Sequence, residues 1–241
     1  MQIRELRLNV QFEYIRDIRK YIYDIEPMLK ENRLCDVLNP VPTIPDDIEP
    51  HIERLSTIKN EENKDIHIFV SQASLAILFV YKTPINFKDI FDKDVEYIAT
   101  ISKKIKSFIK DINPKFKVNF EGLVVATSKT ILKDDETFIN KLDIASDIEE
   151  DRKRVTKKID DKHFYILEKT ILRAYSPEPN IVNPMAVKYD FNSSLGWDYI
   201  VVIEIHNKQE YNLSNNDEKN LELDLDFAKS SINKYFNEEA F

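Results

Sequence analysis

The chain is very poor in glycine, with only Gly122 and Gly196 among its 241 residues. Phosphate-binding loops need several glycines, because consecutive backbone amides must approach the ligand closely. Two isolated glycines cannot form a G-x-G-x-x-G loop, a Walker loop or a G-x-S-x-G nucleophile elbow. Nucleotide-fuelled enzymes of the common kinds are therefore largely excluded, whereas glycine-poor nucleotide sites on other folds are not.

Cysteine is nearly absent as well, since Cys35 is the single one. No intrachain disulfide can form, and nothing places the chain in an oxidising compartment. The first residues lack the cationic head and apolar core of a signal peptide, and the longest apolar runs, such as 73–81, are too short to span a bilayer. We therefore expect a cytoplasmic protein with no membrane partner. Cys35 stands in an apolar setting, which favours a small buried hydrophobe over a nucleophile.

Histidine is scarce and scattered, at His51, His67, His163 and His206. No two of them have the i, i+4 spacing that places imidazoles on one helix face, and no cysteine pair accompanies them. We accordingly predict no catalytic residues, no metal ligands and no cofactor. His67, His163 and His206 lie at or near the ends of predicted strands, which leaves open a site assembled from dispersed residues.

The charge is acidic, with a net value of −8 and a pI near 5.2. Such a chain is repelled by phosphate backbones unless it carries a segregated basic face. The densest basic stretch, 152–158, is flanked by acidic residues on both sides, so its local charge is near zero. We interpret it as a solvated charged segment and do not expect a nucleic-acid partner. The abundant carboxylates show no nuclease spacing, and Glu168-Lys169 lacks the required Glu-x-Lys pattern.

Apolar residues alternate or recur in a way that predicts both strands and helices. The predicted strands are 3–12, 66–71, 75–81, 116–127, 163–175, 185–191 and 197–206. Two hairpins are expected, one joining 66–71 to 75–81 and one joining 185–191 to 197–206 around 192–196. Gly122, inside a predicted strand, indicates a bulge or a close backbone approach.

Apolar residues recur at helical spacing in several segments, and the pattern is clearer in some segments than in others. The stripe over 89–112 is the firmest, and Asn113-Pro114 ends it. Further helices are expected from Tyr14 to about Leu29 with Pro27 inside, near 134–142, and as a short helix near 48–58 in a proline-rich connection. For the last segment we favour a helix from about Asp217 to Phe236, although 221–227 also alternates like a strand.

The order of elements predicts an α+β fold, mainly an antiparallel sheet covered by helices. Two similar sheet-plus-helix halves are suggested, an N-terminal half at 1–115 and a C-terminal half at 116–241, which together could form one continuous domain. The chain also resembles a group of sporadically distributed bacterial proteins of similar length. The resemblance rests on three short motifs, namely Ile68-Phe69-Val70-Ser71-Gln72, Phe120-Glu121-Gly122-Leu123 and Tyr235-Phe236-Asn237. It implies a fold of this kind and no particular chemistry.

Aromatic residues are plentiful, with 14 Phe, 11 Tyr and one Trp. Tyr189, Phe191, Trp197 and Tyr199 cluster on the second predicted hairpin, and such side chains are common in protein interfaces as well as in cores. We take this cluster as the candidate binding surface. The sequence thus favours a non-enzymatic protein-binding module, of the immunity, antitoxin-like, chaperone or phage-defence accessory type, with a homo-oligomer left open. The alternative is a hydrolase or nuclease whose site is assembled from dispersed His, Asp and Glu residues.

Overall fold

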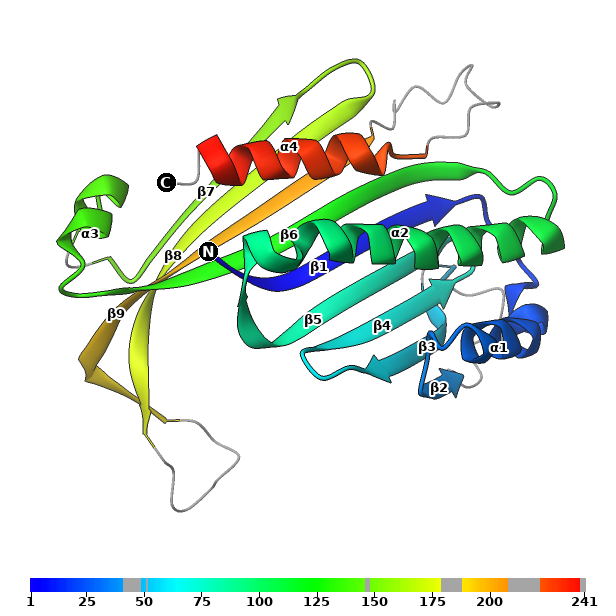
Figure 1. The fold of residues 1–241 in the computed structure, drawn as a ribbon, viewed down its shortest axis with the longest axis horizontal. Helices are drawn as coiled ribbons and strands as arrows, with labels where there is room; N and C mark the ends of the chain where they lie inside the picture. The colour runs from blue at the N-terminus through cyan, green and yellow to red at the C-terminus, as the bar shows by residue number, and fades with distance from the viewer. Residues whose placement is uncertain (41–48, 51, 146–147, 179–187, 208–221, 239–241) are drawn as a thin grey trace.

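The computed structural model describes the chain apart from residues 41–48, 51, 146–147, 179–187, 208–221 and 239–241, and it contains one nine-stranded antiparallel sheet (Figure 1). The order across the sheet is β2-β3-β4-β5-β1-β6-β9-β8-β7. The strands are β1 (Gln2–Phe12), β2 (Val37–Pro40), β3 (Glu53–Asn60), β4 (Lys64–Ser71), β5 (Ser74–Asn86), β6 (Val118–Leu132), β7 (Glu150–Lys158), β8 (His163–Glu178) and β9 (Lys188–Asn207). The helices are the 3-10 helix η1 (Ile18–Tyr21), α1 (Ile22–Glu31), α2 (Phe87–Ile112), α3 (Glu136–Leu142) and α4 (Leu225–Glu238). The predicted α+β class is confirmed.

Helices α2 and α4 lie antiparallel to each other on one face of the sheet. The Phe87 ring at the start of α2 packs on the Phe236 ring near the end of α4, with 4.3 Å between centroids. Further along, Lys229 Nζ of α4 lies 3.2 Å from Glu96 Oε1 of α2. The two helices therefore form a continuous layer over the central strands.

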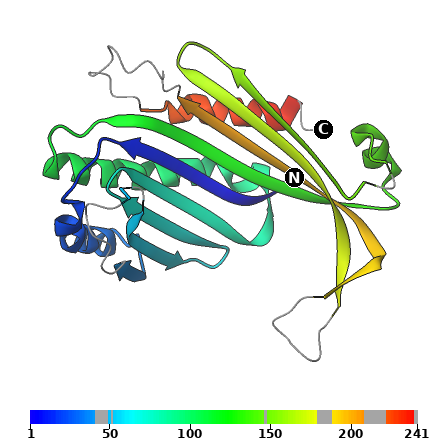
Figure 2. The same ribbon diagram turned by 180° about the vertical axis from the view of Figure 1, so that it is seen from behind.

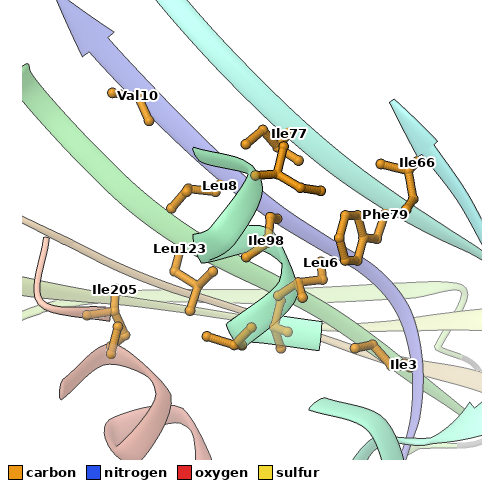
Figure 3. Packing of buried hydrophobic residues seen from close by; sticks show 14 of the residues in the cluster. Ile3, Leu6, Leu8, Val10, Ile66, Ile77, Phe79, Ile98, Leu123 and Ile205 are labelled. Atoms are coloured by element: carbon orange, nitrogen blue, oxygen red, sulfur yellow. The ribbon is translucent and has the colours of Figure 1, made fainter. Parts of the chain in front are cut away.

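The core lies between these helices and the strands (Figure 3). Alternate residues of β1 point toward the helices, and Leu6, Leu8 and Val10 are at most 1% exposed. The α2 stripe supplies the opposing surface, where Ile98 is fully buried. Asn86 caps α2 by accepting a hydrogen bond from the Lys88 backbone N–H at 3.0 Å, which satisfies one of the free donors of the first turn.

The two halves join at the middle of the sheet, where β1 pairs with β6. Outward from this junction the first half runs β1-β5-β4-β3-β2 and the second runs β6-β9-β8-β7. In each half the strand next to the junction strand is the one that leads to the covering helix, β5 to α2 and β9 to α4. The halves thus share one sheet and have the same strand order, except that the first half has one additional strand, β2, at its edge.

Several sequence predictions near the N-terminus need correction. The short helix predicted near 48–58 is wrong over its described second half, because β3 begins at Glu53 and pairs with both β2 and β4. The predicted first helix is divided into η1 and α1, and α1 continues through Pro27 to Glu31. Pro27 is exposed, so its ring meets solvent rather than the core.

The second predicted hairpin is a single strand. β9 runs as one strand from Lys188 to Asn207, and both of its ends pair with β8, with register shifts between Tyr189 and Gly196. Gly196 explains the difference, because its φ of +143° bends the strand, and a Cβ there would lie 2.0 Å from the Ile131 carbonyl oxygen. The turn signal at 192–196 therefore marks a bend in β9.

Two further differences concern the second half. The charged segment predicted to be solvated contains the strand β7. The last helix starts at Leu225, where Asp224 Oδ1 accepts from the Phe227 backbone N–H at 3.0 Å. The Asn-Asn-Asp cluster at 215–217, which was predicted to cap it, lies outside the described residues.

Candidate functional site

The described part of the chain places no helix over the second face of the sheet, which we call the uncovered face (Figure 2). Because side chains alternate along strands, the cross-strand pairing shows which residues share this face. One row crosses the eight strands from β3 to β7 and consists of Ile58, His67, Leu78, Arg7, Val124, Glu204, Ile166 and Thr156. Apolar and polar or charged side chains therefore alternate along this row of the uncovered face.

The neighbouring row of residues on this face has short side chains at its centre. Ala76, Asn9 and Gly122 pair across β5, β1 and β6, with Phe69 on one side and His206 on the other. Short side chains between larger ones leave a depression. Neighbouring side chains fill the space above Gly122, because a Cβ there would lie only 3.1 Å from His206 Cβ and from Phe120 Cζ.

A hollow of about 250 Å³ occupies part of this depression. Its lining residues come from β1, β3, β4 and β5 and mix apolar, hydroxyl and charged groups: Arg7, Asn9, Glu53, Phe69, Ser71, Ser74, Ala76 and Leu78. Two of the hydroxyls, Ser71 Oγ and Ser74 Oγ, are hydrogen-bonded to each other at 2.7 Å. The hollow can therefore accept a partly polar group.

Arg7 is the distinctive charged group of the hollow. Its side chain is 42% exposed, yet its Nε is buried and has no hydrogen-bond acceptor among the described residues. The nearest carboxylate, Glu5 Oε1, lies 3.6 Å away, which is too long for a hydrogen bond. A guanidinium in this position is suited to bind a carboxylate from outside the chain.

Aromatic rings border the depression on the side of β6, β9 and β8. His206 lies between Phe120 and Phe164, with ring centroids 5.3 Å and 5.7 Å away. On the side of β4 the His67 ring stacks on the Phe69 ring, with 6.0 Å between centroids. The depression is thus flanked by aromatic surface, which gives large contact area at low conformational cost.

Two of the four residues of the predicted binding surface are buried in this chain. Trp197 and Tyr199 are 5% and 2% exposed, and Trp197 Nε1 donates to the Ile148 carbonyl oxygen at 3.2 Å. Both side chains belong to the core because they point to the helix side of β9. Tyr189 and Phe191 lie in β9, but their side chains fall outside the described residues.

The histidines do not converge. His163 stacks on Phe227 of α4 at 4.4 Å and so lies on the helix side, whereas His67 and His206 lie on the uncovered face. His67 and His206 are four strand positions apart, which is about 19 Å at the usual strand spacing. His51 lies outside the described residues. The convergence of histidines on which the alternative hydrolase or nuclease site was based is therefore not found among the described residues.

Two buried polar clusters hold α2 on the sheet. Asp94 of α2 accepts from Lys64 Nζ and from the Tyr81 hydroxyl, both at 2.6 Å. Glu121 of β6 accepts from Lys106 Nζ of α2 at 3.1 Å and from the Leu223 backbone N–H at 2.9 Å. Burial is the main cause that raises the pKa of the Tyr81 hydroxyl and of the Glu121 carboxyl. Both clusters lie beneath helices, so we interpret them as structural.

Cys35 is 7% exposed, and burial raises the pKa of its thiol, which agrees with the predicted buried hydrophobe. Within the described residues, no group of three or more His, Cys, Asp or Glu side chains is arranged to hold a metal ion. Nor does any helix in those ranges have the length and apolarity to cross a bilayer.

The sequence contained a usable signal for the uncovered face. The alternation over 3–12 predicted which β1 residues are buried, and therefore also placed Arg7 and Asn9 on the other side. What it could not supply was the partner strands, because strands far apart in sequence bring Leu78, Val124 and His206 to the same face. Comparisons with protein-family models, with curated proteins and with solved structures found no match in any of the three.

Proposed function

We propose that this is a non-enzymatic, cytoplasmic protein-binding module whose uncovered sheet face receives the partner. The observation that carries the proposal is the hollow around Arg7 in a face that no described helix covers. A role as an immunity, antitoxin-like, chaperone or phage-defence accessory protein is compatible with this chemistry.

The apolar content of the face supports a protein partner. Val80 is 38% exposed, and Leu78, Phe69 and Ile166 are half-buried on the same side of the sheet. Contiguous apolar surface with interspersed polar groups is typical of interaction sites on folded proteins. Burial of these side chains against a complementary surface would supply the main favourable free energy of association.

The charges define what the partner presents. A carboxylate of the partner would pair with the exposed part of the Arg7 side chain, and the surrounding Leu78 and Phe69 would exclude water from that ion pair. Ion pairs of this kind at the centre of an interface often account for a large share of the binding free energy. The partner is therefore a protein with an acidic side chain surrounded by apolar ones.

Site-specific crosslinking tests the proposal. A photoreactive phenylalanine analogue placed at position 78 should capture one protein in the native cells, whereas the same residue at exposed position 103 of α2 should not. The captured protein is then purified and titrated against the variants. Arg7→Glu and Leu78→Asp should each raise Kd at least tenfold, which corresponds to about 1.4 kcal/mol. Lys103→Glu, the control, should leave Kd unchanged. Equal capture from both positions, or unchanged Kd in the face variants, would reject the proposal.

A further inference from the structure

Strand β7 (Glu150–Lys158) forms one edge of the sheet, and β8 is its only neighbour in the described part of the chain. Its nine residues pair with β8 in regular register, without a bulge, and include no proline. Eight of them are exposed. The opposite edge, β2, has only four residues. β7 is therefore the longer edge and is open to another strand.

The charge of β7 differs from that of the whole chain. The strand carries five cationic side chains against two anionic ones, in a protein with a net charge of −8. The cationic residues are Arg152, Lys153, Arg154, Lys157 and Lys158. The acidic residues that balance this segment in the sequence lie at the start of the strand and beyond its end. The folded protein therefore has a predominantly basic strand along its edge, in which Lys158 is paired with Asp161 at 2.6 Å.

Part of this positive charge is not neutralised within the protein. Arg152 Nη2 lies 2.7 Å from Glu168 Oε1, and Lys153 Nζ lies 3.5 Å from Asp151 Oδ2. Arg154 and Lys157 form no ion pair with any described residue. These two cations point to opposite faces of the strand, because their positions differ by an odd number of residues.

Protection against edge pairing alone does not explain this basic strand. Proteins protect edge strands with short length, proline, bulges or inward charges as well as with lysine. β7 uses none of the first three, and it exposes Val155, which is 41% exposed. Positive charge repels another cationic strand, but it attracts an acidic one.

We propose that β7 binds an extended acidic segment of a partner protein as an additional antiparallel or parallel strand of the sheet. Backbone hydrogen bonds along the free edge would supply affinity, and the cations on both faces would select Asp and Glu side chains. The inference deepens the proposed protein-binding function and rests on it, but it concerns a surface separate from the Arg7 hollow.

Synthetic peptides test the strand addition directly. The probe is a fluorescent nine-residue peptide in which Glu or Asp alternates with Val or Thr, and the control peptide has the same charge but two central prolines. The acidic peptide should bind, as measured by anisotropy, and should slow hydrogen exchange of β7 backbone amides. The proline peptide should bind at least tenfold more weakly, because proline removes ladder donors.

Matched protein variants separate strand addition from general electrostatics. Arg154→Glu with Lys157→Glu should weaken peptide binding at least tenfold. Lys93→Glu with Lys103→Glu makes the same charge change on exposed positions of α2 and should have less than a twofold effect. Equal binding of the proline peptide, absent protection of β7 amides, or tighter binding of a single-stranded oligonucleotide at the same salt concentration would each overturn the inference. If only this inference fails, the partner captured from position 78 will still depend on Arg7.

Discussion

The buried cluster of Lys64, Tyr81 and Asp94 gives the most quantitative prediction. Asp94 and Lys64 side chains are 2% and 6% exposed, and their charged atoms lie 2.6 Å apart. Asp94→Leu would leave a buried ammonium without its main partner, with Glu61 Oε2 at 3.7 Å as a partial substitute. Breaking a buried pair in this way typically costs about 3–5 kcal/mol. That is a large fraction of the roughly 5–15 kcal/mol available to a typical domain.

A double-mutant cycle measured by urea unfolding checks this reasoning. Asp94→Leu and Lys64→Met should each lower the free energy of unfolding, Asp94→Leu by about 3–5 kcal/mol. The double variant removes both charges, so it should be no less stable than Asp94→Leu alone, with a coupling of about 2 kcal/mol or more. Additive effects, or a loss below about 1 kcal/mol for Asp94→Leu, would show that the pair is not energetically coupled.

Three further predictions address the second half of the chain. Burial raises the pKa of Glu121, so the folded protein holds this proton more tightly than the unfolded chain does. The free energy of unfolding should therefore fall as the pH rises from the ordinary pKa of 4.5 to the raised one. Urea titrations at stepped pH should show this decline in the wild type relative to Glu121→Gln. A hydrogen bond from His163 is the main cause that lowers the pKa of Asp160 to about 2. His163→Ala should raise this pKa toward 3.8 in a carboxyl NMR titration. An unchanged pKa would assign the effect to backbone donors. Gly196→Ala should lower the free energy of unfolding by about 2–4 kcal/mol, because φ is +143° at this position and a Cβ would meet a backbone carbonyl. Gly122→Ala should lower it by less, as measured by chemical denaturation. The reverse order would contradict the bend in β9.

The elements predicted well from sequence are those with strong local patterns. The helix expected at 89–112 is α2 (Phe87–Ile112), since its apolar stripe and the Asn113-Pro114 stop are both local signals. The first hairpin and the first strand are confirmed for the same reason. Gly122 causes no shift in the pairing of β6 with its neighbours at that position, and the close approach is to side chains instead.

The elements that were missed depend on contacts between distant residues. β7 has no apolar alternation, because neither of its faces is covered, and only pairing with β8 makes it a strand. β3 reads as part of a proline-rich connection, yet Leu55 is fully buried once β4 lies beside it. The burial of Trp197 and Tyr199 could not be predicted for the same reason, because an aromatic cluster in the sequence does not reveal which side of a strand faces a helix.

The position of β1 at the centre of the sheet has a consequence for synthesis on the ribosome. β1 is synthesised before β5 and β6 and pairs with both, so Leu8 has no neighbour on one side until Leu123 has been translated. While the intervening residues are translated, one edge of this apolar strand has no neighbour. Such long-range pairing slows folding and exposes an aggregation-prone edge in the nascent chain. Early association with a chaperone, or fast translation between β5 and β6, would be expected to raise the yield of folded protein.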